Sequence, residues 1–283
     1  MEPQSTPRGH IHPISLLIRE ANRIFFDMGF TLVEGPLLES EWYNFDALNV
    51  PKDHPSRDMQ DTFFLKPQID AEQTPVVKQG SLRGVAQINA DKNAPTLLRT
   101  HTSNVQIRYM EAQIKKGIQP PYRIVSMGKV FRNEATDMGH EAEFFQIEAL
   151  AVGEDVTLAN LKGTLARFFR KLFSAKGGSA SGGSGTSVEV RFRPSFFPFT
   201  EPSVEVDMRI TGGHVPEKLR DKWMEMGGAG MVHPSVLKNV GVDSGKYQGF
   251  AFGFGIDRLA MLKWGIDDIR LMHSADLRFI NQF

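Results

Sequence analysis

Apolar residues recur at helical spacing in several segments of the chain. From residue 14 to 28 the apolar positions repeat every three to four residues, with Pro13 in the first turn and Gly29 as a stop, which predicts an amphipathic helix. Similar patterns predict further helices that begin near Glu39 and that cover 105–115, 158–173, 217–226 and 258–263.

Short apolar or alternating runs predict strands between these helices, at 30–33, 122–133, 143–152, 188–193, 203–210 and 249–256. A polar connection joins 122–133 to 143–152, so we expect these two strands to form a long-looped hairpin. Helices and strands do not alternate regularly. This favours an α+β fold, a mostly antiparallel mixed sheet flanked by helices, over a doubly wound one. We expect a single domain over residues 1–283.

Two stretches carry no clear periodicity. Residues 66–96 are polar and mixed, which indicates a loop or hairpin excursion. Residues 177–187 consist almost entirely of glycine and serine, which is typical of a flexible linker. We favour an engineered linker, because strand character resumes at residue 188; a natural low-complexity loop is the alternative.

Composition narrows the function classes. Lysine plus arginine equals aspartate plus glutamate, 33 against 33. A protein that binds nucleic acid unaided usually carries a basic excess, so a partner or another domain should supply much of any such binding. The absence of cysteine excludes disulfides, zinc–thiolate sites and thiol nucleophiles. Without a signal-peptide core or a membrane-length apolar run, the chain is expected to be cytoplasmic and to bind no membrane.

The predicted hairpin carries an unusual set of polar residues. Alternate strand residues share a face, so Arg132 points with Glu134, and Phe144 points with Gln146 and Glu148. An aromatic ring, a guanidinium and a carboxylate together suit a nucleotide: the ring stacks on the base and arginine neutralises phosphate. Solvated charges on an exposed face are the alternative, and this pattern alone does not decide between them.

Three further patterns point to a ligand site. Glycines in the strand 249–256 let a ligand approach the backbone, and Arg258 follows, but no P-loop or GxGxxG spacing is present. Phe197 and Phe199 straddle a proline and form either a wall for a flat ring or part of the core. The segment 99–103 contains histidine and serine, but without a GxSxG elbow a hydrolase is disfavoured.

Taken in order, segments 14–36, 131–148 and 249–262 resemble the three signature motifs of class II aminoacyl-tRNA synthetases. The chain resembles the bacterial-type phenylalanyl-tRNA synthetase alpha subunit more specifically. That resemblance runs from about residue 9 to the last residue, and seven segments carry it: 9–13, 44–48, 99–103, 130–136, 196–202, 230–234 and 276–279.

The resemblance implies activation of phenylalanine with ATP to phenylalanyl-adenylate, and transfer to tRNA(Phe). It implies that Arg132 holds the α-phosphate and the amino-acid carboxylate, and that Glu134 contacts the adenine amine. Phe144 would stack on the adenine, and Arg258 would hold the γ-phosphate. Magnesium would bridge the phosphates, with Glu201 as a candidate ligand. Residues implied to orient the backbone of phenylalanine are His101, Ser103, Gln106, Gln146 and Glu148.

The side chain of phenylalanine would lie sandwiched between Phe197 and Phe199, with Ala251 at the end of its pocket. An alanine there leaves little room for the hydroxyl of tyrosine and offers it no partner. Asp257 stands at a position that is often glutamate in the family.

The resemblance also implies partners. Family members work with a beta subunit, and a homodimer through the first motif is a further expectation. The N-terminal coiled coil that grips tRNA in the family has no counterpart here, so we expect transfer to tRNA to be weak. Two alternatives stay open: a core that is inactive without a beta subunit, and a regulatory or binding paralogue, which the presence of Arg132 and Arg258 disfavours.

Overall fold

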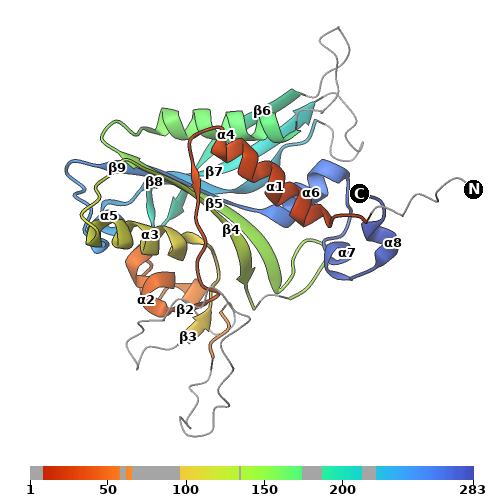
Figure 1. Ribbon diagram of the computed structural model, residues 1–283, viewed down its shortest axis with the longest axis horizontal. Helices are drawn as coiled ribbons and strands as arrows, with labels where there is room; N and C mark the ends of the chain where they lie inside the picture. Colours follow the sequence, from red (N-terminus) through yellow and green to blue (C-terminus); the bar gives the residue numbers. More distant parts are fainter. Residues whose placement is uncertain (1–8, 58–61, 66–95, 134, 174–186, 212–220) are drawn as a thin grey trace, which may run out of the picture.

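The structure is a computed structural model that describes residues 9–57, 62–65, 96–133, 135–173, 187–211 and 221–283. Its centre is a seven-stranded sheet in the order β1-β4-β5-β9-β8-β7-β6 (Figure 1). β1 runs parallel to β4, and the other neighbours are antiparallel. The strands are β1 (Thr31–Leu32), β4 (Tyr122–Phe131), β5 (Glu143–Gly153), β6 (Ser187–Phe197), β7 (Thr200–Thr211), β8 (Met224–Val232) and β9 (Gln248–Gly255).

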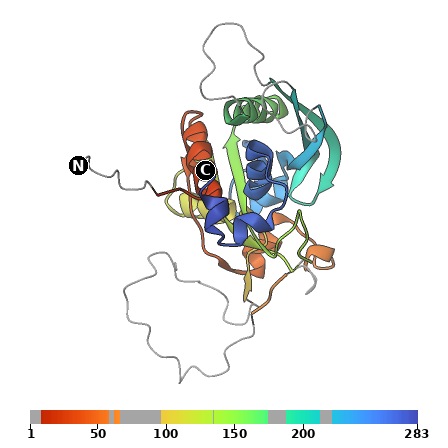
Figure 2. The ribbon, with the colours of Figure 1, turned by 90° about the vertical axis from the view of Figure 1, so that its right-hand side faces the viewer.

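Helices cover the two faces of this sheet. One face carries α1 (Pro13–Phe26), α4 (Leu158–Phe173) and α6 (Ile256–Trp264), which lie together in Figure 2. The other face carries α2 (Glu41–Asn44), α3 (Ser103–Lys115), α5 (Pro234–Asn239) and the 3-10 helix η1 (Asp46–Leu48). A small antiparallel sheet of β2 (Leu38–Ser40) and β3 (Thr96–Leu98) leads into α2 and α3. The remaining elements are η2 (Pro55–Arg57), α7 (Arg270–His273) and α8 (Leu277–Ile280).

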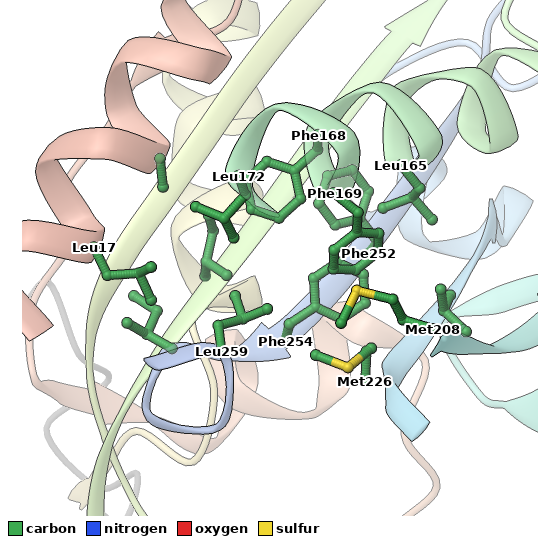
Figure 3. Close-up of a cluster of buried hydrophobic side chains, with 14 of the residues drawn as sticks. Leu17, Leu165, Phe168, Phe169, Leu172, Met208, Met226, Phe252, Phe254 and Leu259 are labelled. Carbon is green, nitrogen blue, oxygen red and sulfur yellow. The ribbon is translucent and has the colours of Figure 1, made fainter. Parts of the chain in front are cut away.

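The larger hydrophobic core lies between the sheet and the helices α1, α4 and α6. Figure 3 shows Phe168 and Phe169 of α4 beside Phe252 and Phe254 of β9, with Leu17 of α1 nearby. All five side chains are buried, and a buried phenylalanine or leucine contributes about 1.5–3 kcal/mol through the hydrophobic effect. This core fixes the sheet against one helical layer.

Strand alternation sends the remaining residues to the opposite face. On β5, Ile147, Ala149 and Ala151 enter the larger core, whereas Leu150 and Val152 pack on the side of α3 in a second cluster. Because alternate strand residues share a face, Gln146 and Glu148 also point toward α3. The sheet therefore presents its apolar side to α1, α4 and α6, and its polar side to α3.

The predicted α+β class and mostly antiparallel sheet are confirmed, as is the hairpin of β4 and β5. The predicted helix 158–173 coincides with α4, and α1 and α6 lie where helices were predicted. α3 begins at Ser103, two residues earlier than predicted. No helix in the described part of the chain is long and apolar enough to cross a membrane.

Two helix predictions need correction. Residues 38–40 form β2, and the helix expected to begin near Glu39 begins at Glu41 and is short. Glu39 is buried because Arg108 of α3 binds its carboxylate, a partner that local sequence does not reveal. Of the helix predicted over 217–226, residues 217–220 lie outside the described residues and 224–226 belong to β8. Of the loop predicted over 66–96, residues 66–95 lie outside the described residues and residue 96 begins β3. Of the linker predicted over 177–187, residues 177–186 lie outside them and residue 187 begins β6.

Candidate active site

A buried carboxylate stands at the centre of the polar face. Glu148 of β5 is 4% exposed, and three groups from the start of α3 donate to it. The Thr102 amide lies 3.2 Å from Oε1, while Ser103 Oγ and Gln106 Nε2 lie 2.5 and 3.1 Å from Oε2. Burial raises the pKa of Glu148 to about 7, although hydrogen bonds from Ser103 and Thr102 oppose the rise. This carboxyl group therefore gains and loses its proton near neutral pH.

The segment 99–103 is a loop that ends as the N-terminus of α3, and it is not extended. Asn44, at the end of α2, holds it in place. Asn44 Nδ2 donates to Thr100 Oγ1 at 3.0 Å, the Thr100 amide donates to Asn44 Oδ1 at 3.3 Å, and His101 Nε2 donates to the Asn44 carbonyl at 2.9 Å. Asn44 is fully buried, so its role is to hold the loop that carries Thr100 and His101.

The tautomer of His101 follows from these contacts. Because Nε2 carries the proton donated to Asn44, Nδ1 of the neutral ring is an acceptor. Nδ1 is buried and has no hydrogen-bond partner among the described residues. Burial, with the positive charge of Arg132 nearby, lowers the pKa of His101 to about 4, so the ring is neutral at pH 7. His101 thus offers an acceptor to a ligand.

Arg99 joins the loop to the rest of the sheet. This buried guanidinium donates through Nε to the Lys129 carbonyl at 2.8 Å and through Nη1 to the Gly35 carbonyl at 3.2 Å. The other terminal nitrogen lies directly over Gly128, where any side chain would collide with it. Arg99 therefore connects the loop after β1 to the C-terminal half of β4. Sequence reasoning assigned no role to Arg99 or Asn44, although both lie in segments that carry the family resemblance.

Arg132 and Phe144 lie next to each other across the hairpin. The guanidinium carbon of Arg132 is 5.1 Å from the centroid of the Phe144 ring, and Arg132 Nε donates to the Thr100 carbonyl at 3.1 Å. The structure thus brings together the arginine and the aromatic ring that the sequence singled out. Glu134 lies outside the described residues.

Glycines on β8 and β9 leave room for the side chains around Glu148. Gly228 pairs with Gly253, and Gly230 pairs with Ala251. A Cβ atom at Gly253 would lie 3.0 Å from Glu148 Cγ and 3.1 Å from Gln146 Nε2. Small residues are needed here because the long side chains of β5 lean over the neighbouring strand. Gln146 Oε1 is buried without a partner among the described residues, so it is a second free acceptor in this region.

Phe197 and Phe199 form one aromatic wall. Their rings are parallel within 6°, with centroids 5.7 Å apart. A third ring stacked between them would need about 7 Å, twice the optimal contact distance between carbon atoms. The two rings stack on each other here, so the sandwich stays a prediction that requires them to move apart. Phe197 lies over Gly228, where a Cβ atom would be 2.8 Å from the ring.

Arg258 and Glu201 lie outside the buried cluster. Arg258 is exposed in the first turn of α6 and makes no hydrogen bond or ion pair within the described ranges. The Glu201 side chain is 75% exposed, and its Oε2 lies 3.4 Å from His233 Nε2. No group of three or more histidine, aspartate or glutamate side chains gathers as a metal site anywhere in the described residues. Among the described residues Glu201 is not part of such a group, so its role as a magnesium ligand stays a prediction.

Comparison with known proteins identifies the family. A family model described as the class II core domain of tRNA synthetases (F) matches residues 1–283. The phenylalanine–tRNA ligase alpha subunit of Anoxybacillus flavithermus is 46% identical over 279 residues, which cover 98% of this chain and 69% of that protein. The alpha subunit of Dechloromonas aromatica is 44% identical over 280 residues, covering 98% and 70%. The chain belongs to the phenylalanine–tRNA ligase alpha subunit family of class II synthetases.

Proposed function

We propose that this chain activates phenylalanine with ATP to form phenylalanyl-adenylate, and transfers the phenylalanyl group to tRNA(Phe). The observation that carries the proposal is the buried cluster around Glu148. Its acceptors, Glu148 itself, His101 Nδ1 and Gln146 Oε1, suit an ammonium group, which donates three hydrogen bonds. A positive charge there would also stabilise the ionised form of Glu148.

The ATP half of the site would lie beside this cluster. Phe144 would stack on the adenine, while Arg132, 5.1 Å from that ring, would hold the α-phosphate and the amino-acid carboxylate. A carboxylate oxygen of phenylalanine would attack the α-phosphorus, and the bond from that phosphorus to the bridging oxygen would break to release pyrophosphate. Arg132 would neutralise the charge that develops, and Arg258 would hold the γ-phosphate. Catalysis then needs positioning and charge stabilisation but no protein nucleophile.

Selection of phenylalanine over other amino acids would depend on β9 and on the aromatic wall. Ala251 lies between Leu150 and Gly230 on the site side of the sheet and packs on the second apolar cluster. We propose that a phenylalanine ring lies against Phe197 or Phe199 with its far edge toward Ala251. The hydroxyl of tyrosine would then meet an apolar wall without a hydrogen-bond partner.

Magnesium, tRNA and a beta subunit are further parts of the proposal. Magnesium bound to ATP keeps several waters and needs few protein ligands, so its binding does not require a cluster of carboxylates; no step here depends on it. The balanced charge of the chain supports a second chain as the source of much of the tRNA affinity. Two apolar clusters on opposite faces of one sheet support a single domain.

The test is pyrophosphate exchange into ATP with the purified chain. We expect exchange that depends on phenylalanine and is weaker with tyrosine. Arg132→Ala should lower the exchange rate by about a hundredfold or more, the usual cost of removing a group that stabilises the transition state. Arg123→Ala is the matched control, because Arg123 is exposed on β4, the strand that ends just before Arg132.

Exchange that does not depend on phenylalanine, or that survives Arg132→Ala unchanged, would contradict the proposal. A folded chain that is silent alone but active after addition of a beta subunit would support the family reaction and reject a self-sufficient core.

A further inference from the structure

A buried acidic side chain closes the end of the sheet behind the proposed nucleotide site. β9 pairs with β5 as far as Gly255, which lies opposite Gln146, and the chain then turns into α6. The next amide on β5, that of Phe145, has therefore lost its strand partner. Asp257, in the first turn of α6, supplies the missing acceptor: its Oδ2 lies 2.6 Å from the Phe145 nitrogen. The Asp257 side chain thus takes the place of the backbone acceptor that a neighbouring strand would supply.

The second oxygen of this carboxylate has a partner from another element. His273, on α7, donates from Nε2 to Asp257 Oδ1 at 2.8 Å. Asp257 is 1% exposed and the His273 side chain is 23% exposed, so the carboxylate is shielded from water while the imidazole is partly exposed. Hydrogen bonding to Asp257, together with the nearby charges of Glu141 and Glu143, raises the pKa of His273. The imidazolium form is therefore favoured beside this carboxylate.

α7 is itself held from two sides. The Ile269 amide, just before the helix, donates to the Met138 carbonyl at 3.1 Å, in the connection between β4 and β5. His12 Nε2, at the start of α1, donates to the Met272 carbonyl at 2.8 Å, and Figure 1 shows α7 near that end of α1. His273 therefore projects from a fixed helix, and its contact with Asp257 is a defined link.

This link lies between the two groups proposed to hold ATP. Phe144 directly precedes the amide that Asp257 binds, and Arg258 directly follows Asp257. We infer that Asp257 and His273 are positioning residues for ATP, which hold the Phe144 ring and the first turn of α6 with Arg258 in one fixed geometry. The inference rests on the proposed function, because it assigns the pair to the nucleotide half of that site. The proposed phenylalanine contacts on β5, Gln146 and Glu148, point to the α3 face of the strand, and the donors to Glu148 lie on α3, so the Asp257–His273 pair does not touch them.

The test is direct binding of ATP and of phenylalanine, each measured by calorimetry, so no turnover is needed. His273→Ala should weaken ATP binding roughly tenfold, at the lower end of the effect of removing a partner from a buried charged group. Affinity for phenylalanine should stay unchanged. His273→Gln should restore ATP affinity, because its amide can donate to Asp257 from a similar position. Arg270→Ala is the matched control, since it removes an exposed ion pair with Asp268 from the same helix.

The possible results distinguish the inference about Asp257 and His273 from the proposed function. Wild-type protein that binds ATP with the same affinity as His273→Ala would overturn the inference alone. A loss of both ATP and phenylalanine affinity, in parallel with a lower melting temperature and without rescue by glutamine, would also overturn it, because the pair would then be merely structural. Wild-type protein that binds neither ligand would overturn the proposed function and the inference together. ATP binding that shows the expected pattern, without pyrophosphate exchange either alone or after addition of a beta subunit, would support the inference and reject only the proposed reaction.

Discussion

Replacing Glu148 with glutamine should stabilise the ligand-free protein at alkaline pH. The pKa of Glu148 is raised from 4.5 to about 7, so between these values the folded protein binds more protons than the unfolded chain. The free energy of unfolding therefore falls as pH rises from 4.5 to 7 and is level above 7. The shift corresponds to about 3 kcal/mol of destabilisation by the ionised carboxylate. Glu148→Gln removes the ionisation and with it this cost.

The amide also brings a cost that does not depend on pH. Glu148 Oε2 accepts from Ser103 and Gln106, and an amide nitrogen at that position would force one donor to turn away. Losing one such bond costs about 1 kcal/mol. The net gain expected at pH 8 is therefore roughly 2 kcal/mol, and it should become a small loss near pH 5.

The assay is urea-induced unfolding of both proteins at several pH values from 5 to 8.5, without ligands. The decisive quantity is the difference in unfolding free energy between variant and wild type as a function of pH. A difference that is the same at every pH would refute the reasoning, because Glu148 would then not be the group that titrates. The same titration predicts that phenylalanine binds wild type more weakly as pH falls through 7, when the carboxylate that would face its ammonium becomes protonated, and that Glu148→Gln loses this pH dependence.

Three glycines give contrasting predictions. Gly128→Ala should lower the melting temperature strongly and weaken phenylalanine-dependent exchange, because a methyl group displaces the buried Arg99 guanidinium; thermal unfolding and exchange assays check this. Gly228→Ala should raise the KM for phenylalanine more than the KM for ATP, because its Cβ atom would lie 2.8 Å from the Phe197 ring and displace it. Equal increases in the two KM values would contradict the proposed site for the phenylalanine ring. Gly163→Ala, in α4 with no atom within 4 Å of the new methyl, should raise stability by about 0.5–1 kcal/mol in urea unfolding and leave activity unchanged.

Strand periodicity was sufficient to find half of the site. Alternation along residues 143–152 predicted that Gln146 and Glu148 share a face, and both lie against Gly253 in the structure. The same alternation separated them from Ile147 and Ala149, which enter the core. Such predictions succeed because a two-residue repeat is fixed by backbone geometry alone.

The supporting residues could not be predicted in this way. Asn44 holds residues 56 and 57 positions further along the chain, and Arg99 binds carbonyls 30 and 64 positions away. A buried amide or guanidinium has no local periodicity that distinguishes it from an exposed one. Glu39 was misplaced for the same reason, since Arg108, which buries it, lies 69 residues away. These contacts depend on tertiary structure, which pattern reasoning does not reach.

The site therefore depends on one strand, β5, whose two faces have different roles. Alternate residues of β5 pack in the apolar core. This packing keeps the strand, and with it Glu148, in place although the ionised form of Glu148 is unfavourable there. A carboxylate that is costly to ionise without a ligand gains most from a bound cation. The destabilisation of the free protein and the affinity for an ammonium group then have one physical origin, so a substitution that relieves the first should weaken the second.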